Sequence, residues 1–190
     1  MMQSTVQQIH NVGVNGGSDK IMYQMSVNFL DNPGIMENSG IQRYQVRTNL
    51  DAKINKFITV GTQTFASQER GQLGNVQTMF NFLWQATPGQ MPFYDGRYGG
   101  ANDPVITNTN NPLFTINQQG GKIVTNRFNS TVYLNLNLAR GLVMENRFNY
   151  QTNMVERNSF QRPFDRWNFL QDQAFTQANT VDQLGVNYSF

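Results

Sequence analysis

The chain contains no cysteine and one histidine, His10, among its 190 residues. The absence of cysteine excludes a disulfide framework, a thiolate metal site and a cysteine nucleophile. A single histidine argues against a histidine-based zinc site and against a Ser-His-Asp triad, and we interpret His10 as an interfacial or structural residue. Asp95-Gly96 with Asp103 lacks the spacing of an EF-hand loop and is interpreted as a turn. We therefore expect no enzyme activity, no cofactor and no bound metal.

Long apolar runs and charged residues are also scarce. No stretch approaches the ~18 uncharged apolar residues of a membrane-spanning helix, and the first residues lack the basic and apolar regions of a signal peptide. Charged residues make up 14% of the chain, against roughly 25% in a typical soluble domain. The net charge of +2 is too small to suggest nucleic acid as a partner.

Neutral amides take the place of the missing charges. The chain contains 25 Asn and 20 Gln, together with 14 Phe, 7 Tyr and 2 Trp. This aromatic content is too high for a chain that is simply disordered, because aromatic side chains supply apolar surface for a folded state. The composition therefore indicates a folded protein whose polar surface is made mainly of amides.

Apolar and polar residues alternate along most of the chain, which is typical of half-buried β-strands. The alternation predicts seven strands, in residues 10–14, 21–30, 43–51, 57–67, 127–139, 142–152 and 184–190. A helical period occurs at Val76, Met79, Phe80 and Leu83, which predicts one short amphipathic helix inside a loop.

The connections between the predicted strands alternate between short and long. Tight turns are expected at 16–19, around Asn55 and at 140–141. Long loops are expected at 31–40, 68–122 and 155–178. Short turns at one rim and long loops at the other are typical of outer-membrane β-barrels, and strands of ten or more residues suit a tilted membrane crossing.

The polar sides of these strands carry amides, hydroxyls and isolated arginines, where a soluble sheet would usually carry Lys and Glu. The apolar sides carry no charge at 21–29, 44–50 or 128–138, and an Arg or Lys facing lipid there would cost roughly 2–4 kcal/mol. We therefore predict an all-β fold: an antiparallel up-and-down meander within a large transmembrane β-barrel, with the helix in an external loop. The alternative is a soluble β-sandwich, such as a carbohydrate-binding or adhesin module, with its apolar sides facing each other across a dry core.

Two groups of residues are the predicted sites. The polar residues expected to face the barrel lumen are Arg43, Arg47, Asn49, Asn135, Asn137, Arg147 and Asn149. They are suited either to docking a plug or lining a substrate path, or to hydrogen bonding across the wall and to water. The aromatic residues expected to contact a ligand or partner are Trp84, Tyr94, Tyr98 and Trp167, for which the alternative is packing within the loops and at the membrane boundary.

An ordered series of short motifs extends over most of residues 7–155. Its members are Gly16-Gly17-Ser18-Asp19-Lys20 with Tyr23-Gln24-Met25-Ser26, Gly34-Ile35, Arg43-Tyr44-Gln45-Val46-Arg47-Thr48-Asn49-Leu50-Asp51, Val60-Gly61, Pro92-Phe93-Tyr94-Asp95-Gly96-Arg97-Tyr98-Gly99 and Asn111-Pro112. In this order the motifs resemble the SusC/RagA-type TonB-dependent outer-membrane receptors, in which they follow the plug domain and open the barrel.

The resemblance implies an import receptor whose barrel has about 22 strands around an internal plug, energised by TonB and paired with a SusD-like surface lipoprotein. Residues 1–190 would be a fragment of the early barrel wall, with about seven strands and without the plug, the signal peptide or the TonB-contacting segment. The implied location is the outer membrane, and the implied substrate is a glycan, oligosaccharide or peptide nutrient. The implied partners are membrane lipid, the rest of the barrel and plug, the TonB complex through that plug, and the lipoprotein.

Overall fold

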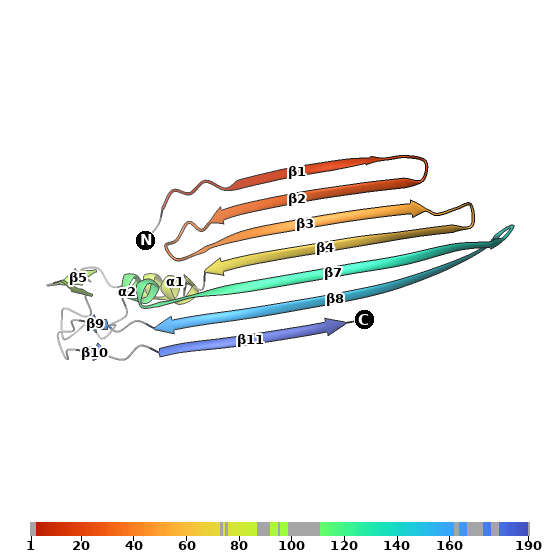
Figure 1. Cartoon of the computed structure of the whole chain (residues 1–190). Coiled ribbons are helices and arrows are strands. Elements are labelled where there is room, and N and C mark those ends of the chain that lie inside the picture. Colours follow the sequence, from red (N-terminus) through yellow and green to blue (C-terminus); the bar gives the residue numbers. More distant parts are fainter. Residues whose placement is uncertain are drawn as a thin grey trace.

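Seven long antiparallel strands form a single sheet in the computed structural model (Figure 1). The structure describes residues 3–72, 74, 76–86, 92–94, 96–98, 111–161, 164–166, 173–175 and 179–189. The strands are β1 (Gln8–Gly17), β2 (Ile21–Pro33), β3 (Gly40–Lys53), β4 (Ile58–Gln72), β7 (Gln119–Ala139), β8 (Leu142–Gln161) and β11 (Asn179–Ser189). Each of them pairs with the strand that follows it in this series. The predicted up-and-down meander is confirmed, and it is consistent with a piece of a β-barrel.

Tight turns join β1 to β2, β3 to β4 and β7 to β8 at one end of the sheet, which we call the turn end. In the first turn the Ser18 hydroxyl accepts hydrogen bonds from two backbone N–H groups, and in the second the Asn55 side chain does the same. The third turn depends on Gly141, whose φ of 84° lies in the left-handed region that glycine adopts without strain.

The opposite end, which we call the loop end, carries the helices and short strands (Figure 1). The predicted helix is present as α1 (Val76–Gln85), and a second helix that was not predicted, α2 (Pro112–Gln118), precedes β7. A small sheet is formed there by β5 (Phe93–Tyr94), β6 (Arg97–Tyr98), β9 (Phe164–Arg166) and β10 (Gln173–Phe175).

The long strands continue further toward the loop end than the alternation predicted. The strand ladder runs to Gln72 in β4, from Gln119 in β7 and to Gln161 in β8, so parts of the expected loops at 68–122 and 155–178 are strand. Both sides of the strands are polar along much of these extensions. The apolar alternation that marks a half-buried strand therefore fades before the hydrogen-bonded ladder ends.

The buried core of the described residues is small and lies at the loop end. Met79 of α1 and Ile116 of α2 are fully buried, and Met36 of the β2–β3 loop packs with them. Asn111 caps α2, because its side-chain oxygen accepts hydrogen bonds from the N–H groups of Leu113 and Phe114 at 3.0 and 3.3 Å. This cluster fixes the helices against the loop end of the sheet.

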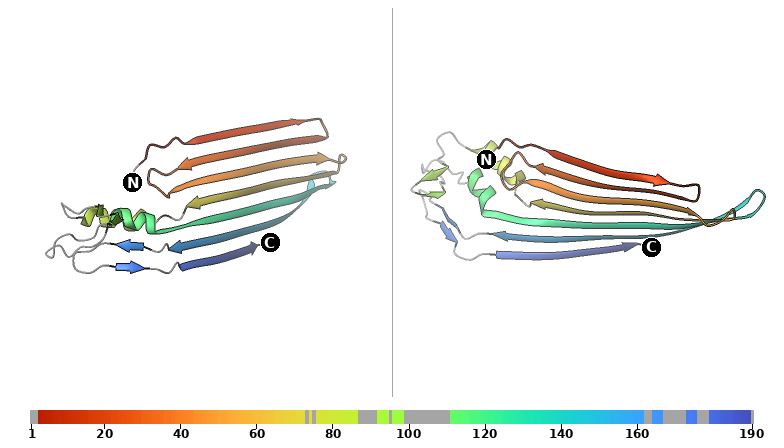
Figure 2. Two further views of the ribbon diagram at one scale, coloured as in Figure 1. Left: turned by 60° about the vertical axis from the view of Figure 1, so that its left-hand side comes forward. Right: turned by 45° about the horizontal axis from the view of Figure 1, so that its top comes forward.

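The two faces of the seven-stranded sheet differ in chemistry. One face, the apolar face, carries side chains such as Val12, Val132 and Phe148, which are 73%, 52% and 62% exposed. The other, the amide face, carries the Asn, Gln and Arg side chains. Among the described residues no second sheet covers either face, and the sheet is one layer deep in every view (Figure 2). The dry core of the alternative β-sandwich is therefore not found in this part of the chain.

A row of rings lies toward the loop end of the apolar face. His10 stacks on Phe29 at 6.2 Å between ring centroids, Phe29 contacts Tyr44 at 4.9 Å, and Phe128 contacts Tyr150 at 6.2 Å. From Phe128 to Leu138 on the same face of β7 the strand rises about 33 Å at roughly 3.3 Å per residue. Tilted by about 40°, this length matches the ~25 Å apolar band of a transmembrane barrel. In the described part of the chain no helix has the length and apolarity needed to cross a membrane.

Candidate functional site

The strand register brings all the residues predicted to face a lumen onto the amide face. Arg47 of β3 pairs with Phe65 of β4, which pairs with Asn129 of β7, which in turn pairs with Gln151 of β8. Because side chains alternate between faces along each strand, this register fixes which residues share a face. The predicted residues on the amide face are Arg43, Arg47 and Asn49 of β3, Asn135 and Asn137 of β7, and Arg147 and Asn149 of β8.

Two shallow hollows meet at Arg47 and Phe65 in the middle of the amide face, and we call them the Arg47 hollows. The larger has a volume of about 310 Å³ and the smaller about 210 Å³. The Arg47 guanidinium carbon lies 5.8 Å from the centre of the Phe65 ring, in the range of a cation–π contact. The remaining lining residues are Asn11, Ser26, Asn28, Gln45, Asn49, Gln63, Thr64, Asn129 and Thr131.

Side-chain hydrogen bonds between neighbouring strands order the amides around these hollows. Asn49 donates to the Gln24 side-chain oxygen at 3.3 Å. Asn149 donates to the Asn129 oxygen at 3.1 Å and to the Thr131 hydroxyl at 2.8 Å. Each amide offers two N–H donors and an acceptor oxygen, so these bonds leave hydrogen-bonding capacity for hydroxyl groups of a ligand or for water.

Toward the loop end, two arginines share one carboxylate. Arg43 and Arg127 each place a terminal guanidinium nitrogen 4.0 Å from the same oxygen of Glu69. The side chains of Arg43 and Arg127 are 35% and 48% exposed, and the Arg43 Nε has no hydrogen-bond partner. One carboxylate at this distance neutralises only part of the charge of the two guanidinium groups.

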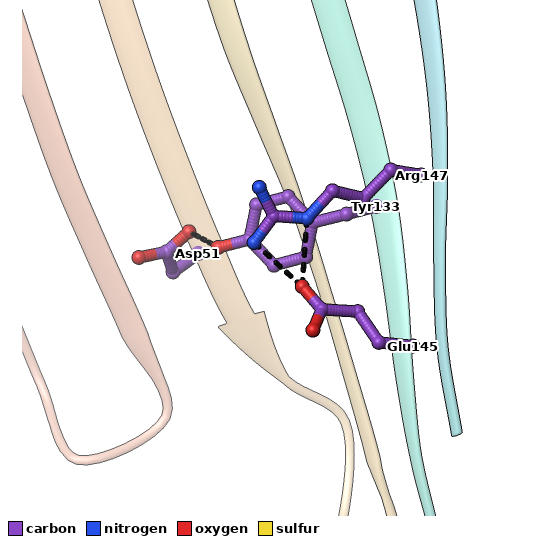
Figure 3. A network of polar contacts seen from close by, with 4 residues as sticks. All are labelled: Asp51, Tyr133, Glu145 and Arg147. Carbon is purple, nitrogen blue, oxygen red and sulfur yellow. Dashed lines mark hydrogen bonds and ion pairs between the residues drawn. The ribbon is translucent and has the colours of Figure 1, made fainter. Parts of the chain in front are cut away.

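Toward the turn end, Tyr133 crosses a strand to reach an acid. Its ring lies over Gly61 of β4, and its hydroxyl donates a hydrogen bond to Asp51 of β3 (Figure 3). Arg147 lies 6.0 Å from the centre of the same ring and forms an ion pair of 2.6 Å with Glu145. Both of these carboxylates, Asp51 and Glu145, therefore have a side-chain partner at this end of the amide face.

The two predicted asparagines of β7, Asn135 and Asn137, differ in their hydrogen bonding within the sheet. Asn137 donates from its side chain to the Lys56 carbonyl at 3.3 Å, and its backbone N–H donates to the Phe57 carbonyl at 2.8 Å. These bonds tie β7 to the β3–β4 turn. The side-chain oxygen of Asn135 is buried without a hydrogen-bond partner.

Three of the four aromatic residues predicted to contact a ligand or partner, Trp84, Tyr94 and Tyr98, belong to elements at the loop end, away from the Arg47 hollows. Trp84 is 88% exposed near the end of α1. Tyr98 packs against Phe93 and Phe114, with ring centroids 5.0 and 5.4 Å apart. Tyr94 lies in β5, and its side chain, like all of Trp167, lies outside the described residues.

The predicted site residues leave out several that complete this face: Gly61, Phe65, Glu69, Arg127 and Tyr133. Alternation alone assigns Arg127 and Tyr133 to the polar side of their strand. The pairing of Glu69 with two arginines depends on register across three strands, which no local pattern reports. Within the described residues no group of histidines and carboxylates could hold a metal ion.

Comparison with known proteins gives two informative matches. TonB-dependent receptor P26 of Formosa agariphila is 24% identical over 155 residues, which is 79% of this chain. TonB-dependent receptor P39 of the same organism is 30% identical over 147 residues, or 74% of the chain. The matched segments span 15% and 14% of the two receptors, so this chain corresponds to about one seventh of their length. No family model matches the chain. The two matches support the TonB-dependent receptor family.

Proposed function

We propose that this chain forms part of the barrel wall of a TonB-dependent outer-membrane receptor that imports a nutrient. The observation that carries the proposal is the exposed apolar face of a one-layer sheet. Val12, Val132 and Phe148 are each more than half exposed on that face, and lipid is the solvent that stabilises such a surface. Each fully buried side chain of this kind contributes about 1.5–3 kcal/mol relative to exposure in water.

In this orientation the amide face lines the lumen. A lumen-facing wall holds water and contacts either a plug or the passing substrate, and both contacts use directional hydrogen bonds. The Arg47 hollows supply amides, a guanidinium and an aromatic ring within one region. These groups suit a glycan or oligosaccharide, because sugar hydroxyls bind amides and sugar rings stack on aromatic faces.

The order of short motifs along the chain supports the SusC/RagA type within the receptor family. The whole receptor would carry a plug, take its energy from the TonB complex through that plug, and accept substrate from a SusD-like lipoprotein at the loop end. Trp84 is the residue proposed to contact that lipoprotein or the substrate, because its side chain is 88% exposed at the loop end. The proposed role is transport, without catalysis or a cofactor.

Neighbouring residues on opposite faces test the orientation of the wall. The chain has no cysteine, so Thr131→Cys and Val132→Cys each introduce a single thiol for a spin label. A second pair is Gln45→Cys and Val46→Cys. With the receptor produced from its own gene in outer membranes, the labels at Val132 and Val46 should be relaxed more by lipid-soluble oxygen than by a water-soluble nickel chelate. The labels at Thr131 and Gln45 should show the opposite preference or be shielded from both reagents.

Equal preference at both members of each pair would contradict the wall assignment, since adjacent residues of a membrane strand lie in different solvents. Burial of the Val132 and Val46 labels from both reagents, with the Thr131 and Gln45 labels in water, would indicate a sandwich core. If an antibody against the receptor does not detect it in outer-membrane fractions, the proposed location is excluded.

A further inference from the structure

The charges on the amide face are distributed unevenly between its two ends. At the turn end, Asp51 accepts a hydrogen bond from Tyr133, and Glu145 pairs with Arg147 at 2.6 Å. At the loop end, the described strands carry several arginines on this face but one acid, Glu69. The arginines of this half of the face are Arg43, Arg127 and Arg157, and Arg47 lies at its boundary in the middle of the sheet. This half of the amide face is therefore positively charged.

The described part of the chain supplies little compensation for this charge. Glu69 lies at 4.0 Å from both Arg43 and Arg127, a distance at which partly exposed pairs interact weakly. Among the described side chains no carboxylate lies within ion-pair range of Arg47, whose contact is the Phe65 ring. If these arginines served only to hold strands together, we would expect each to form a close ion pair, as Arg147 does with Glu145 at 2.6 Å.

The positions of the arginines connect the charge to the Arg47 hollows. Arg43 and Arg47 lie on the same strand and the same face, with one residue of that face between them, and Arg127 lies across β4 from β3. Both terminal nitrogens that contact Glu69 lie 4.0 Å from one oxygen. The guanidinium groups of Arg43 and Arg127 therefore converge at Glu69, on the loop-end side of the hollows that Arg47 lines.

A guanidinium group recognises an oxyanion by parallel N–H···O bonds, and such bonds are shorter and stronger than those between neutral groups. Cavities lined by one sign of charge also concentrate ligands of the opposite sign, and rings of Arg or Lys select anions in pores. We propose that Arg43, Arg47 and Arg127 form an anion-binding line that selects acidic oligosaccharides over neutral ones. Carboxylate or sulfate groups bind the arginines, and the amides of the Arg47 hollows bind the sugar hydroxyls. This inference rests on the proposed import function.

Binding of labelled oligosaccharides to outer membranes from cells that produce the receptor from its own gene tests the proposal. The probes are tetragalacturonate for carboxylates, a carrageenan tetrasaccharide for sulfates, and neutral maltotetraose. The variants are Arg47→Gln and the double variant Arg43→Gln/Arg127→Gln, and Arg47→Lys keeps the charge. The matched control is Arg70→Gln, because Arg70 follows Glu69 on β4 and lies on the opposite face.

We expect at least one acidic probe to bind more tightly than maltotetraose, and its affinity to fall as salt rises. Each glutamine variant should weaken that binding about tenfold, as the loss of a charge-assisted hydrogen bond does, while Arg47→Lys retains most of it. The identity of the affected probe distinguishes a carboxylate ligand from a sulfate ligand. Arg70→Gln should leave the binding of every probe unchanged.

Three outcomes would overturn the inference and leave the proposed function standing. They are equal binding of acidic and neutral probes, tighter binding of maltotetraose alone, and an equal loss of all probes in the glutamine variants. A fourth outcome is a fall in the outer-membrane content of both the Gln and Lys variants, which would assign the arginines to holding the wall or the plug. If none of the oligosaccharides binds to the wild-type membranes, the oligosaccharide part of the proposed function fails together with the inference.

Discussion

Gly61→Ala is the substitution that most directly tests the contact in which Tyr133 reaches across β4. A Cβ atom at position 61 would clash with the Tyr133 ring and hydroxyl, and it would lie 2.7 Å from Asp51 Oδ1. The ring has to move, because backbone on both sides of Gly61 is fixed in the ladders with β3 and β7. The hydrogen bond from Tyr133 to Asp51 is then lost.

The expected destabilisation follows from that bond. A hydrogen bond to a charged group contributes about 1.5–3 kcal/mol, and the partly buried position of Tyr133 places this one toward the lower value. Alanine also restricts the unfolded chain more than glycine does, and this raises the free energy of unfolding by about 0.4–1 kcal/mol. We therefore expect Gly61→Ala to lower the free energy of unfolding by about 0.5–1 kcal/mol.

A double-mutant cycle isolates the steric part of this effect. Receptor extracted from outer membranes and reconstituted in phospholipid vesicles is unfolded in urea with wild-type, Gly61→Ala, Tyr133→Ala and doubly substituted protein. In the Tyr133→Ala background, Gly61→Ala should leave the free energy of unfolding unchanged or raise it by up to about 1 kcal/mol, because the obstructing ring is gone and the restriction of the unfolded chain remains.

The matched control is Gly13→Ala on β1. A Cβ atom there would meet its nearest neighbours at 3.6 and 3.7 Å, which is ordinary contact, so the substitution should be neutral or slightly stabilising. If the effects of Gly61→Ala and Tyr133→Ala simply add, or if Gly13→Ala is as costly as Gly61→Ala, the reasoning about the crossing is refuted.

Three further predictions concern the faces and the core. Val132→Arg should lower the free energy of unfolding in vesicles by about 2–4 kcal/mol, whereas Thr131→Arg on the other face should cost much less; equal costs would argue against the lipid assignment. Met79→Ala should destabilise the helix cluster by about 2–5 kcal/mol, seen as faster hydrogen exchange in α1 with the long strands unchanged. Removing the exposed Glu145–Arg147 pair by Arg147→Gln should lower the free energy of unfolding by less than about 1 kcal/mol, and a larger loss would mean that Arg147 supports the Tyr133 ring.

The sequence was sufficient to predict the meander because each strand carries its own signal. Segments such as 127–139 alternate apolar and polar residues over their whole length, and the tight turns contain residues that favour them. The face of each predicted lumen residue followed directly, since alternation assigns a side. Strand ends were predicted less well, because Gln119 and Gln161 lie in extensions that are polar on much of both sides.

The pairings on the amide face could not be predicted from sequence. Alternation places Arg43 on a side but gives no height relative to Glu69, which lies 26 positions later, or to Arg127 on a third strand. Helix α2 was missed because it has only seven residues and draws its stability from Asn111 and from burial of Ile116 against Met79. Such contacts between distant segments depend on the folded arrangement.

The length of β7 and β8 has a consequence for how a substrate would first meet the receptor. From Phe128 in the aromatic row to Gln119, β7 continues in ladder with β8, a rise of about 30 Å along the strand. In the proposed orientation this part of the wall extends outside the bilayer as a pair of hydrogen-bonded strands. The hydrogen-bond register of β7 and β8 therefore fixes how far this part of the wall extends beyond the aromatic row, whatever the length of the loops that it carries.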